Sequence, residues 1–143
     1  MIKSSSKAAT KRKLVSQCDV LVRQLVLSRD GYKCCKCGGT NVLQAAHILS
    51  KGPWSRIRFA VLNVLTLCVR CHLYWAHRDP IAFVDWLEDM YPGRIQQLKI
   101  MAATRGKLDL KLIKLSLQVE VNELDPPSKA ILPDLECSKN IPF

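Results

Sequence analysis

The chain has 143 residues, which is enough for one domain with a modest core and too few for two ordinary domains. Its net charge of +10 comes entirely from residues 1–60, where twelve Lys and Arg face only Asp19 and Asp30, whereas residues 61–143 hold ten residues of each sign. A basic half of this kind suits a polyanion such as a nucleic acid. A solvated basic tail, an acidic protein partner or an anionic membrane surface would also fit the charge alone.

Membrane-spanning and secreted proteins are excluded by other features of the sequence. No apolar run approaches the roughly 20 residues that a membrane helix needs, and the polar start Met1–Lys7 lacks the apolar stretch of a secretory signal. We therefore expect a cytoplasmic protein with no membrane segment. Thiols stay reduced in that compartment, so cysteines bind metal more often than they form disulfides.

A flexible basic leader, residues 1–9, and one long helix are predicted at the start of the chain. The helix should run from Thr10 to Arg29, because apolar residues recur there at three- and four-residue spacings. Gly31 suits the left-handed cap that often ends a helix. The apolar stripe consists of Leu14, Cys18, Leu21, Val22, Leu25 and Val26.

A hairpin and further helices are predicted in the middle of the chain. Residues 41–48 read as a short strand and 65–67 as its partner, and a helix should cover about 69–77. Asp79 followed by Pro80 is a good start for the next helix, because aspartate caps the first turn and proline tolerates its first position. These elements predict an α+β fold that is mostly helical.

The last third is predicted to add helices and an irregular end. A break at Pro92–Gly93 should precede a short helix through Met101. Residues 108–121 alternate as a strand would, but Asp109 could cap a helix, which we favour. Residues 125–143 hold four prolines and read as an irregular tail, leaving one domain over 10–124. The helix after Pro80 should bury Phe83, Trp86, Leu87 and Met90.

Two CxxC segments predict a structural zinc site. Tetrahedral zinc takes four thiolates, and each CxxC turn supplies two from one tight bend. The four ligands would be Cys34, Cys37, Cys68 and Cys71. Cys35 cannot join Cys37 in such a turn and should be a bystander, Cys18 should be a core residue, and Cys137 has no evident role.

Thirty residues separate Cys37 from Cys68, more than a plain zinc ribbon uses, and chemistry-bearing side chains lie in and beside this segment. His47 ends the first predicted strand, Asn63 precedes the second, and His72 follows the second CxxC. A metal-closed hairpin can bring these three side chains to one cleft. The purely structural alternatives are that His47 is a hydrogen-bonded core residue and that Asn63 is a turn or capping residue. His72 could instead be a fourth zinc ligand or a group that supports the ligands.

The order and spacing of these motifs resemble the HNH (ββα-metal) endonuclease family over residues 29–78. Further segments at Trp75, His77, Asp79–Pro80 and Tyr91–Gly93 are similar to small phage-type members, which implies a bacterial or phage-infected cell. The motifs that carry the resemblance are Arg29–Cys34 with Cys37–Gly38, Ala46–His47–Ile48, and Asn63–Cys68 with Cys71–His72.

The resemblance implies a ββα-metal core flanked by an N-terminal helix and C-terminal helices, and a metal-dependent DNA endonuclease. His47 would be the general base that deprotonates the attacking water, Asn63 would orient His47 or help ligate a catalytic cation, and His72 would ligate that cation. The cation would be Mg²⁺, Mn²⁺ or a similar ion, and the products a 5′-phosphate and a 3′-hydroxyl. The alternative is a zinc-containing nucleic-acid-binding module without catalysis.

Two features leave the ligand set open. Many family members place Asp or His immediately before the general base, where this chain has Ala46. His77 is a candidate replacement, but it lies five residues after His72, about 140° around an ideal helix. Both can ligate one ion only if the helix ends or distorts between them; otherwise His77 is a surface residue.

The predicted DNA contacts lie in the basic loop between the strands. Arg56 and Arg58 could bind phosphates or simply solubilise the loop. Trp54, beside Pro53, could stack on a base. Lys51 completes the set of candidate DNA-binding residues.

Overall fold

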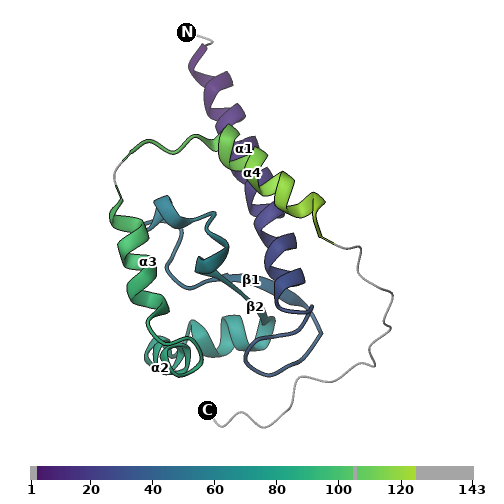
Figure 1. Cartoon of the computed structure of the whole chain (residues 1–143), viewed down its shortest axis with the longest axis vertical. Coiled ribbons are helices and arrows are strands. Elements are labelled where there is room, and N and C mark those ends of the chain that lie inside the picture. The colour runs from purple at the N-terminus through teal and green to yellow at the C-terminus, as the bar shows by residue number, and fades with distance from the viewer. Residues whose placement is uncertain (1–2, 105, 125–143) are drawn as a thin grey trace.

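The computed structural model describes residues 3–104 and 106–124, and the predicted tail at 125–143 lies outside them. The fold is α+β and mostly helical, as predicted, with one two-stranded sheet at its centre (Figure 1). No helix of the described part is long and apolar enough to cross a membrane. The main elements are α1 (Lys3–Arg29), β1 (Leu43–His47), β2 (Val64–Cys68), the π-helix η3 (Arg70–Ala76), α2 (Pro80–Met90), α3 (Arg94–Ala103) and α4 (Leu110–Asn122), with single 3₁₀ turns η1 (Ser55–Ile57) and η2 (Val61–Asn63).

Helix α1 begins earlier than predicted. It starts at Lys3 rather than Thr10, so most of the expected flexible leader is helical. The segment contains Ser, Lys and Ala but no Gly or Pro, and nothing in it breaks the helix. The predicted C-terminal cap is confirmed: Gly31 has φ 64°, its amide donates to Ser28, and the Tyr32 amide donates to Leu27. These two bonds form the Schellman motif that satisfies the last carbonyls of a helix.

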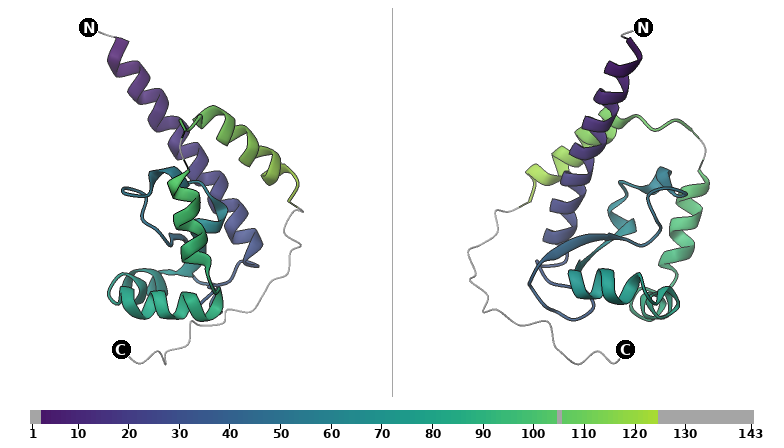
Figure 2. Two further views of the ribbon diagram at one scale, coloured as in Figure 1. Left: turned by 60° about the vertical axis from the view of Figure 1, so that its left-hand side comes forward. Right: turned by 180° about the vertical axis from the view of Figure 1, so that it is seen from behind.

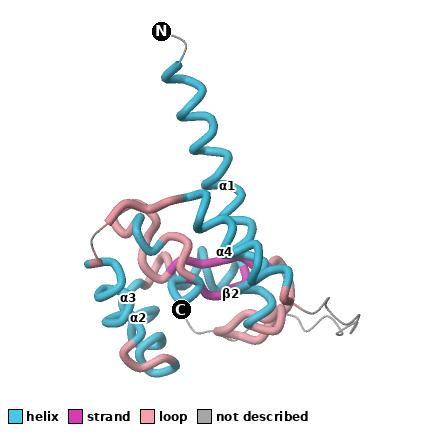
Figure 3. The backbone as a smooth tube through the Cα atoms, turned by 45° about the horizontal axis from the view of Figure 1, so that its top comes forward, coloured by secondary structure: helices cyan, strands magenta, loops and turns pink. Residues whose placement is uncertain are grey.

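The central hairpin agrees with the two predicted strands. β1 and β2 pair antiparallel, with Leu43 opposite Cys68 and His47 opposite Val64. Every residue of β2 is buried, since the strand lies between two apolar clusters. One cluster joins α1 and α4 to Val64, and the other joins Leu67 to the cysteines. Figure 3 shows the hairpin in magenta among the surrounding helices.

Helix α2 starts as the sequence predicts. The Asp79 carboxylate accepts from the Ala82 amide at 2.9 Å, and Pro80 occupies the first turn. Phe83 and Leu87 are buried and Trp86 is half-buried, but Met90 is 54% exposed. The prediction for Met90 was therefore wrong. It is the last residue of the helix, where the chain turns away and no neighbouring element covers it.

Helix α4 settles the ambiguity at 108–121 in favour of a helix. The Asp109 carboxylate accepts from the amides of Lys111 and Leu112 at 2.9 and 3.2 Å, so it caps the first turn as proposed. The alternation of apolar residues at 108–121 does not reflect a strand, because some of these residues pack on α1 and the others face solvent. Figure 2 shows α4 alongside the middle of α1. The residues of the α1–α4 contact are Leu110, Ile113, Leu117 and Val121, whose spacing is helical.

Candidate functional site

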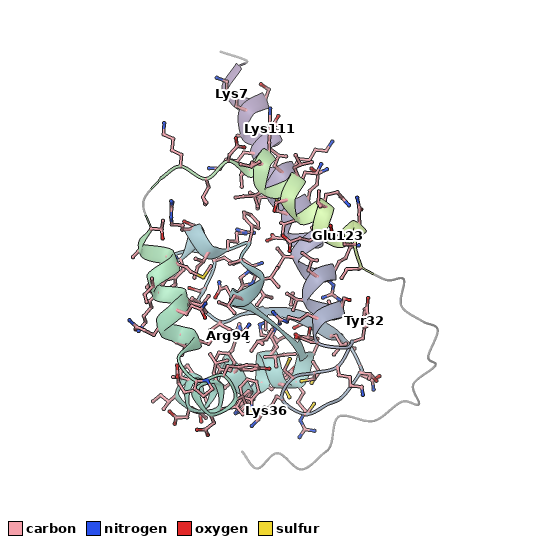
Figure 4. All side chains as sticks on the ribbon, in the orientation of Figure 1. Lys7, Tyr32, Lys36, Arg94, Lys111 and Glu123 are labelled. Carbon is pink, nitrogen blue, oxygen red and sulfur yellow. The ribbon has the colours of Figure 1, made fainter. Side chains whose placement is uncertain are left out.

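The four predicted cysteine ligands converge. The sulfur atoms of Cys34, Cys37, Cys68 and Cys71 all lie within 4.8 Å of one another. Figure 4 draws sulfur in yellow and shows several sulfur atoms gathered near the hairpin. A tetrahedral zinc with bonds of about 2.3 Å holds its sulfurs about 3.8 Å apart. Cys37 and Cys68 match this value, with 3.8 Å between their Sγ atoms. This cluster can hold a metal ion such as zinc.

Backbone hydrogen bonds shape the first CxxC turn. The Gly38 amide donates to the Cys34 carbonyl, and the Cys34 amide donates to Gly39, both at 2.8 Å. Gly38 has φ 74°, a left-handed conformation that a residue without Cβ adopts without strain. The Cys35 amide donates to Thr66 on β2 at 2.8 Å and so ties this turn to the sheet.

Cys35 differs chemically from its neighbour. Burial, reinforced by the negative charge of Asp30, raises the pKa of Cys35 to about 11. A hydrogen bond from the Cys71 thiol lowers the pKa of Cys34 to about 4. Metals bind thiolates rather than thiols, so the two adjacent cysteines are suited to different roles. Cys18 is fully buried in the α1–α4 core, as predicted, and Cys137 lies outside the described residues.

The predicted general base and the first predicted cation ligand line one cleft. His47 comes from the end of β1 and His72 from η3, and both border a cleft of about 480 Å³. Lys51 from the following loop also lines it, as does the α1 residue Asp19. The sequence expectation that the hairpin and the second CxxC bring these histidines together is consistent with this arrangement.

The tautomer of His47 follows from its hydrogen bond. Its Nε2 lies 2.9 Å from the Arg58 carbonyl oxygen. Because a carbonyl only accepts, Nε2 must carry the proton, which leaves the Nδ1 lone pair free. Burial lowers the pKa of His47, and the positive charges of Lys51 and Arg58 act in the same direction, although the bond to the carbonyl opposes them. The ring is therefore neutral at physiological pH and can accept a proton at Nδ1.

The helix distortion that a His72–His77 pair needs is present. Residues 70–76 form a π-helix, in which hydrogen bonds run from i to i+5, and the His77 amide donates to the His72 carbonyl at 3.2 Å. Residues five apart therefore share a face. The two Nε2 atoms lie 3.2 Å apart. Two imidazole nitrogens bound to one ion at about 2.1 Å lie about 3.0–3.4 Å apart, depending on its geometry.

Gln44 orients His72. Its Oε1 lies 2.7 Å from Nδ1 of His72, and this amide oxygen can only accept, so Nδ1 carries the proton and Nε2 keeps its lone pair. A ligating histidine usually donates its other N–H to an oxygen in this way. Gln44 lines the same cleft, and sequence reasoning missed it. Its position on β1, three residues before His47, was the only available signal.

Asn63 is fully buried and supports the loop after β1 rather than the cleft. Its Oδ1 accepts from the Leu49 amide at 2.8 Å, and its Nδ2 donates to the carbonyls of Leu49 and Ile57 at 3.0 and 3.3 Å. Arg58, whose carbonyl binds His47, follows Ile57 directly. Asn63 therefore orients His47 through the loop backbone, and these bonds engage both of its polar atoms, which leaves neither directed at a cation.

Two arginines hold the segment around Asn63 from either side. Arg94 of α3, labelled in Figure 4, is buried and donates to the Leu62 carbonyl from Nε and Nη2 at 2.9 and 2.6 Å. Arg29 of α1 donates to the carbonyls of Val61 and Val64 at 2.9 and 2.8 Å. Burial lowers the pKa of Arg94, but its guanidinium stays charged. Nothing in the local sequence distinguishes Arg94 from a surface residue, and sequence reasoning missed it.

The candidate DNA-binding residues separate into two groups. Lys51 is exposed on the cleft, and Trp54 is half-buried in the loop. Arg58 instead forms an ion pair with Asp19, with bonds of 3.1 and 2.6 Å, and Arg56 donates to the Gly106 carbonyl. Both arginines thus hold the loop against other parts of the fold.

Ala46 does not border the cleft. It is 3% exposed and packs in the cluster that includes Leu67 and the cysteines. Among the described residues, the four cysteines are the only group of three or more His, Cys, Asp or Glu side chains close enough to share an ion. The chain matches no family model, no curated protein and no solved structure, so a functional assignment depends on this geometry.

Proposed function

We propose that the protein is a metal-dependent DNA endonuclease of the HNH (ββα-metal) class. One observation carries the proposal: His47, with a free Nδ1, shares a cleft with His72, whose Nε2 is paired with that of His77. The antiparallel hairpin followed directly by η3 supports a ββα core. A base beside a potential cation site is what hydrolysis of a phosphodiester requires.

His47 acts on the attacking water. As the water oxygen bonds to phosphorus, one of its protons passes to Nδ1, while the Nε2–H bond to the Arg58 carbonyl holds the ring in place. The bond from phosphorus to the 3′-oxygen breaks, and that oxygen is finally protonated. The products are a 5′-phosphate and a 3′-hydroxyl. Burial of His47 favours its neutral form, which is the form that accepts the proton.

His72 and His77 would hold the catalytic cation. A divalent ion there would neutralise charge on the phosphate and on the leaving 3′-oxygen. Gln44 fixes His72 in the tautomer that directs a lone pair toward the ion. Imidazole pairs favour Mn²⁺, Ni²⁺ or Zn²⁺ over Mg²⁺, which prefers oxygen ligands. The four cysteines would hold a separate structural zinc that fixes the hairpin to η3.

A second candidate is a zinc-containing nucleic-acid-binding module without catalysis. The buried Ala46 favours it, because the position before the general base supplies no ligand, and the histidine pair has no third His, Cys, Asp or Glu partner among the described residues. The same cleft and basic surface would then serve binding alone.

Plasmid cleavage distinguishes the two candidates. Wild type and His47→Ala are incubated with supercoiled plasmid and Mg²⁺, Mn²⁺ or Ni²⁺, with EDTA as the metal-free arm. We expect wild type to cut with metal, leaving ends that ligase rejoins, and His47→Ala to lose 10²–10⁴-fold in rate. Zinc content and DNA affinity of the variant should match wild type. Equal cutting by both proteins would refute the role of His47, and no cutting under any metal would favour the binding module.

A further inference from the structure

The N-terminal turns of α1 project beyond the body of the protein. All three ribbon and tube views show this end of the helix free of other elements (Figures 1–3). Every residue from 6 to 13 is exposed, and Leu14 is the first to be partly buried. This segment, residues 3–14, is called the α1 arm below. A helix without a packing partner at this end gains little stability from burial. Its charged side chains are therefore available to a binding partner.

The α1 arm is strongly basic. Lys7, Lys11, Arg12 and Lys13 lie on it, and no acidic residue precedes Asp19. None of the four forms an ion pair with any residue that the structure describes. Lys7 and Lys11 stand four residues apart, a spacing at which like charges disfavour a helix.

The cleft continues onto one face of the arm. The α1 residues that line the cleft are Ser16, Asp19, Val20, Val22 and Arg23, and together they mark its face of the helix. Successive residues turn by about 100°, which puts Arg12 about 10° and Lys13 about 90° from the middle of this face around the axis. Four residues rise about 6 Å, so Arg12 follows the cleft edge by little more than one helical turn.

The other two lysines lie farther from the middle of the cleft face. Lys7 and Lys11 lie about 150° and 110° from it around the helix axis. Figure 4 labels Lys7 near the free end of the arm. Besides Lys3, the arm therefore carries two pairs of positive charges on one helix, and the Arg12–Lys13 pair is the nearer of the two to the face that borders His47.

We propose that Arg12 and Lys13 form a phosphate-binding surface for the DNA duplex whose backbone enters the cleft. The inference rests on the proposed function and deepens it. The arginines expected to grip DNA, Arg56 and Arg58, are held by Gly106 and Asp19. Arg23 and Lys51 line the cleft without an ion pair among the described residues, and Arg12 and Lys13 add further unpaired positive charge beyond its edge. A stretch of about 6 Å is about two base-pair steps, so this contact falls on phosphates near the bond to be cut.

The test compares two variants with the same change in charge. Arg12→Gln/Lys13→Gln and Lys7→Gln/Lys11→Gln each remove two positive charges from the same helix, the first pair nearer to the cleft face and the second farther from it. Both are made in a His47→Ala background and measured without added catalytic metal, by fluorescence anisotropy on a labelled duplex over a range of salt. Circular dichroism checks that the helix is retained.

We expect Arg12→Gln/Lys13→Gln to flatten the slope of log affinity against log salt by about 1.8, since each phosphate contact contributes about 0.9. At about 0.1 M salt this corresponds to a loss of affinity of tens of fold. Lys7→Gln/Lys11→Gln should change the slope by well under 0.9. Equal effects of the two variants would mean that the arm acts only through its overall charge, which would overturn the proposal. It would also be overturned if Arg12→Gln/Lys13→Gln had no effect, or if the parent protein bound no duplex.

The outcome is independent of cleavage. Because binding is measured with His47 absent, a protein that never cuts can still show the difference between the two variants. The phosphate-binding surface would then stand while the nuclease proposal failed. Conversely, an active nuclease indifferent to both variants would retain the proposed function and lose this surface.

Discussion

Substitution of Asn63 by alanine tests the loop that positions His47, the proposed general base. Asn63 is fully buried and makes three hydrogen bonds to backbone groups of Leu49 and Ile57. Asn63→Ala removes all three and takes these partners from the Leu49 amide and carbonyl, whereas the Ile57 carbonyl still accepts from the Ala60 amide at 3.1 Å. Each buried hydrogen bond contributes about 1 kcal/mol net, so the free energy of unfolding should fall by about 3 kcal/mol.

The same change should also lower the cleavage rate of the molecules that remain folded. Loss of the bond to Ile57 removes one of the two hydrogen bonds on the carbonyl directly before Arg58, whose own carbonyl holds His47. Misplacing a catalytic group by about 1 Å costs on the order of 10²-fold in rate. Zinc content should be unchanged, because none of the side-chain hydrogen bonds of Asn63 involves a cysteine.

Urea unfolding in the presence of zinc measures the first effect, and single-turnover plasmid cleavage at a temperature where the variant is folded measures the second. Asn122→Ala is the matched control: Asn122 is exposed and accepts one hydrogen bond from Gln118, so its loss should cost well under 1 kcal/mol. Stability of Asn63→Ala within about 0.5 kcal/mol of wild type would refute the assignment of Asn63 to the loop.

Three further predictions concern the metal sites and pH. Cys68→Ser should lose bound zinc and unfold or aggregate, measured by native mass spectrometry and circular dichroism, and a stable zinc-free variant would contradict the structural site. His77→Ala should abolish cleavage at low Mn²⁺ and partly recover at high Mn²⁺, whereas Gln44→Ala should shift the metal midpoint less, by about 10-fold. The single-turnover rate should still exceed half of its plateau at pH 6.5, the ordinary pKa of histidine, because burial lowers the pKa of His47 and only its protonated form is inactive as a base. A rate already halved at pH 7.5 would contradict this.

The sequence was most informative where one residue determines one local structure. Asp79–Pro80 and Asp109 start α2 and α4 through their own carboxylates, and Gly31 ends α1 through its left-handed conformation. The four cysteines could be grouped from spacing alone, because a CxxC turn is a local structure. Each of these predictions needed only a few consecutive residues.

Contacts between distant residues could not be predicted in this way. Arg94 reaches Leu62 across 32 positions, and Arg58 pairs with Asp19 across 39. From the sequence alone, an arginine in a basic loop is predicted to contact phosphate, because the carboxylate that pairs with it lies far away in the chain. The early start of α1 at Lys3 was missed because helical periodicity is recognised from an apolar stripe. The arm packs against no other element that the structure describes, and so it carries no such stripe.

The π-helix η3 connects the cysteine cluster to the His72–His77 pair, which the sequence analysis treated separately. Cys71 lies in its first turn with its sulfur in the cysteine cluster, and His72 follows with its ring on the cleft. An α-helix from the same start would carry His77 about 140° from His72, away from any shared ion. The extra residue in the turn brings the two Nε2 atoms to 3.2 Å. π-turns are found frequently at functional sites. The position of η3, which contains Cys71 and His72 and ends directly before His77, therefore supports the proposed roles of both histidines independently of motif spacing.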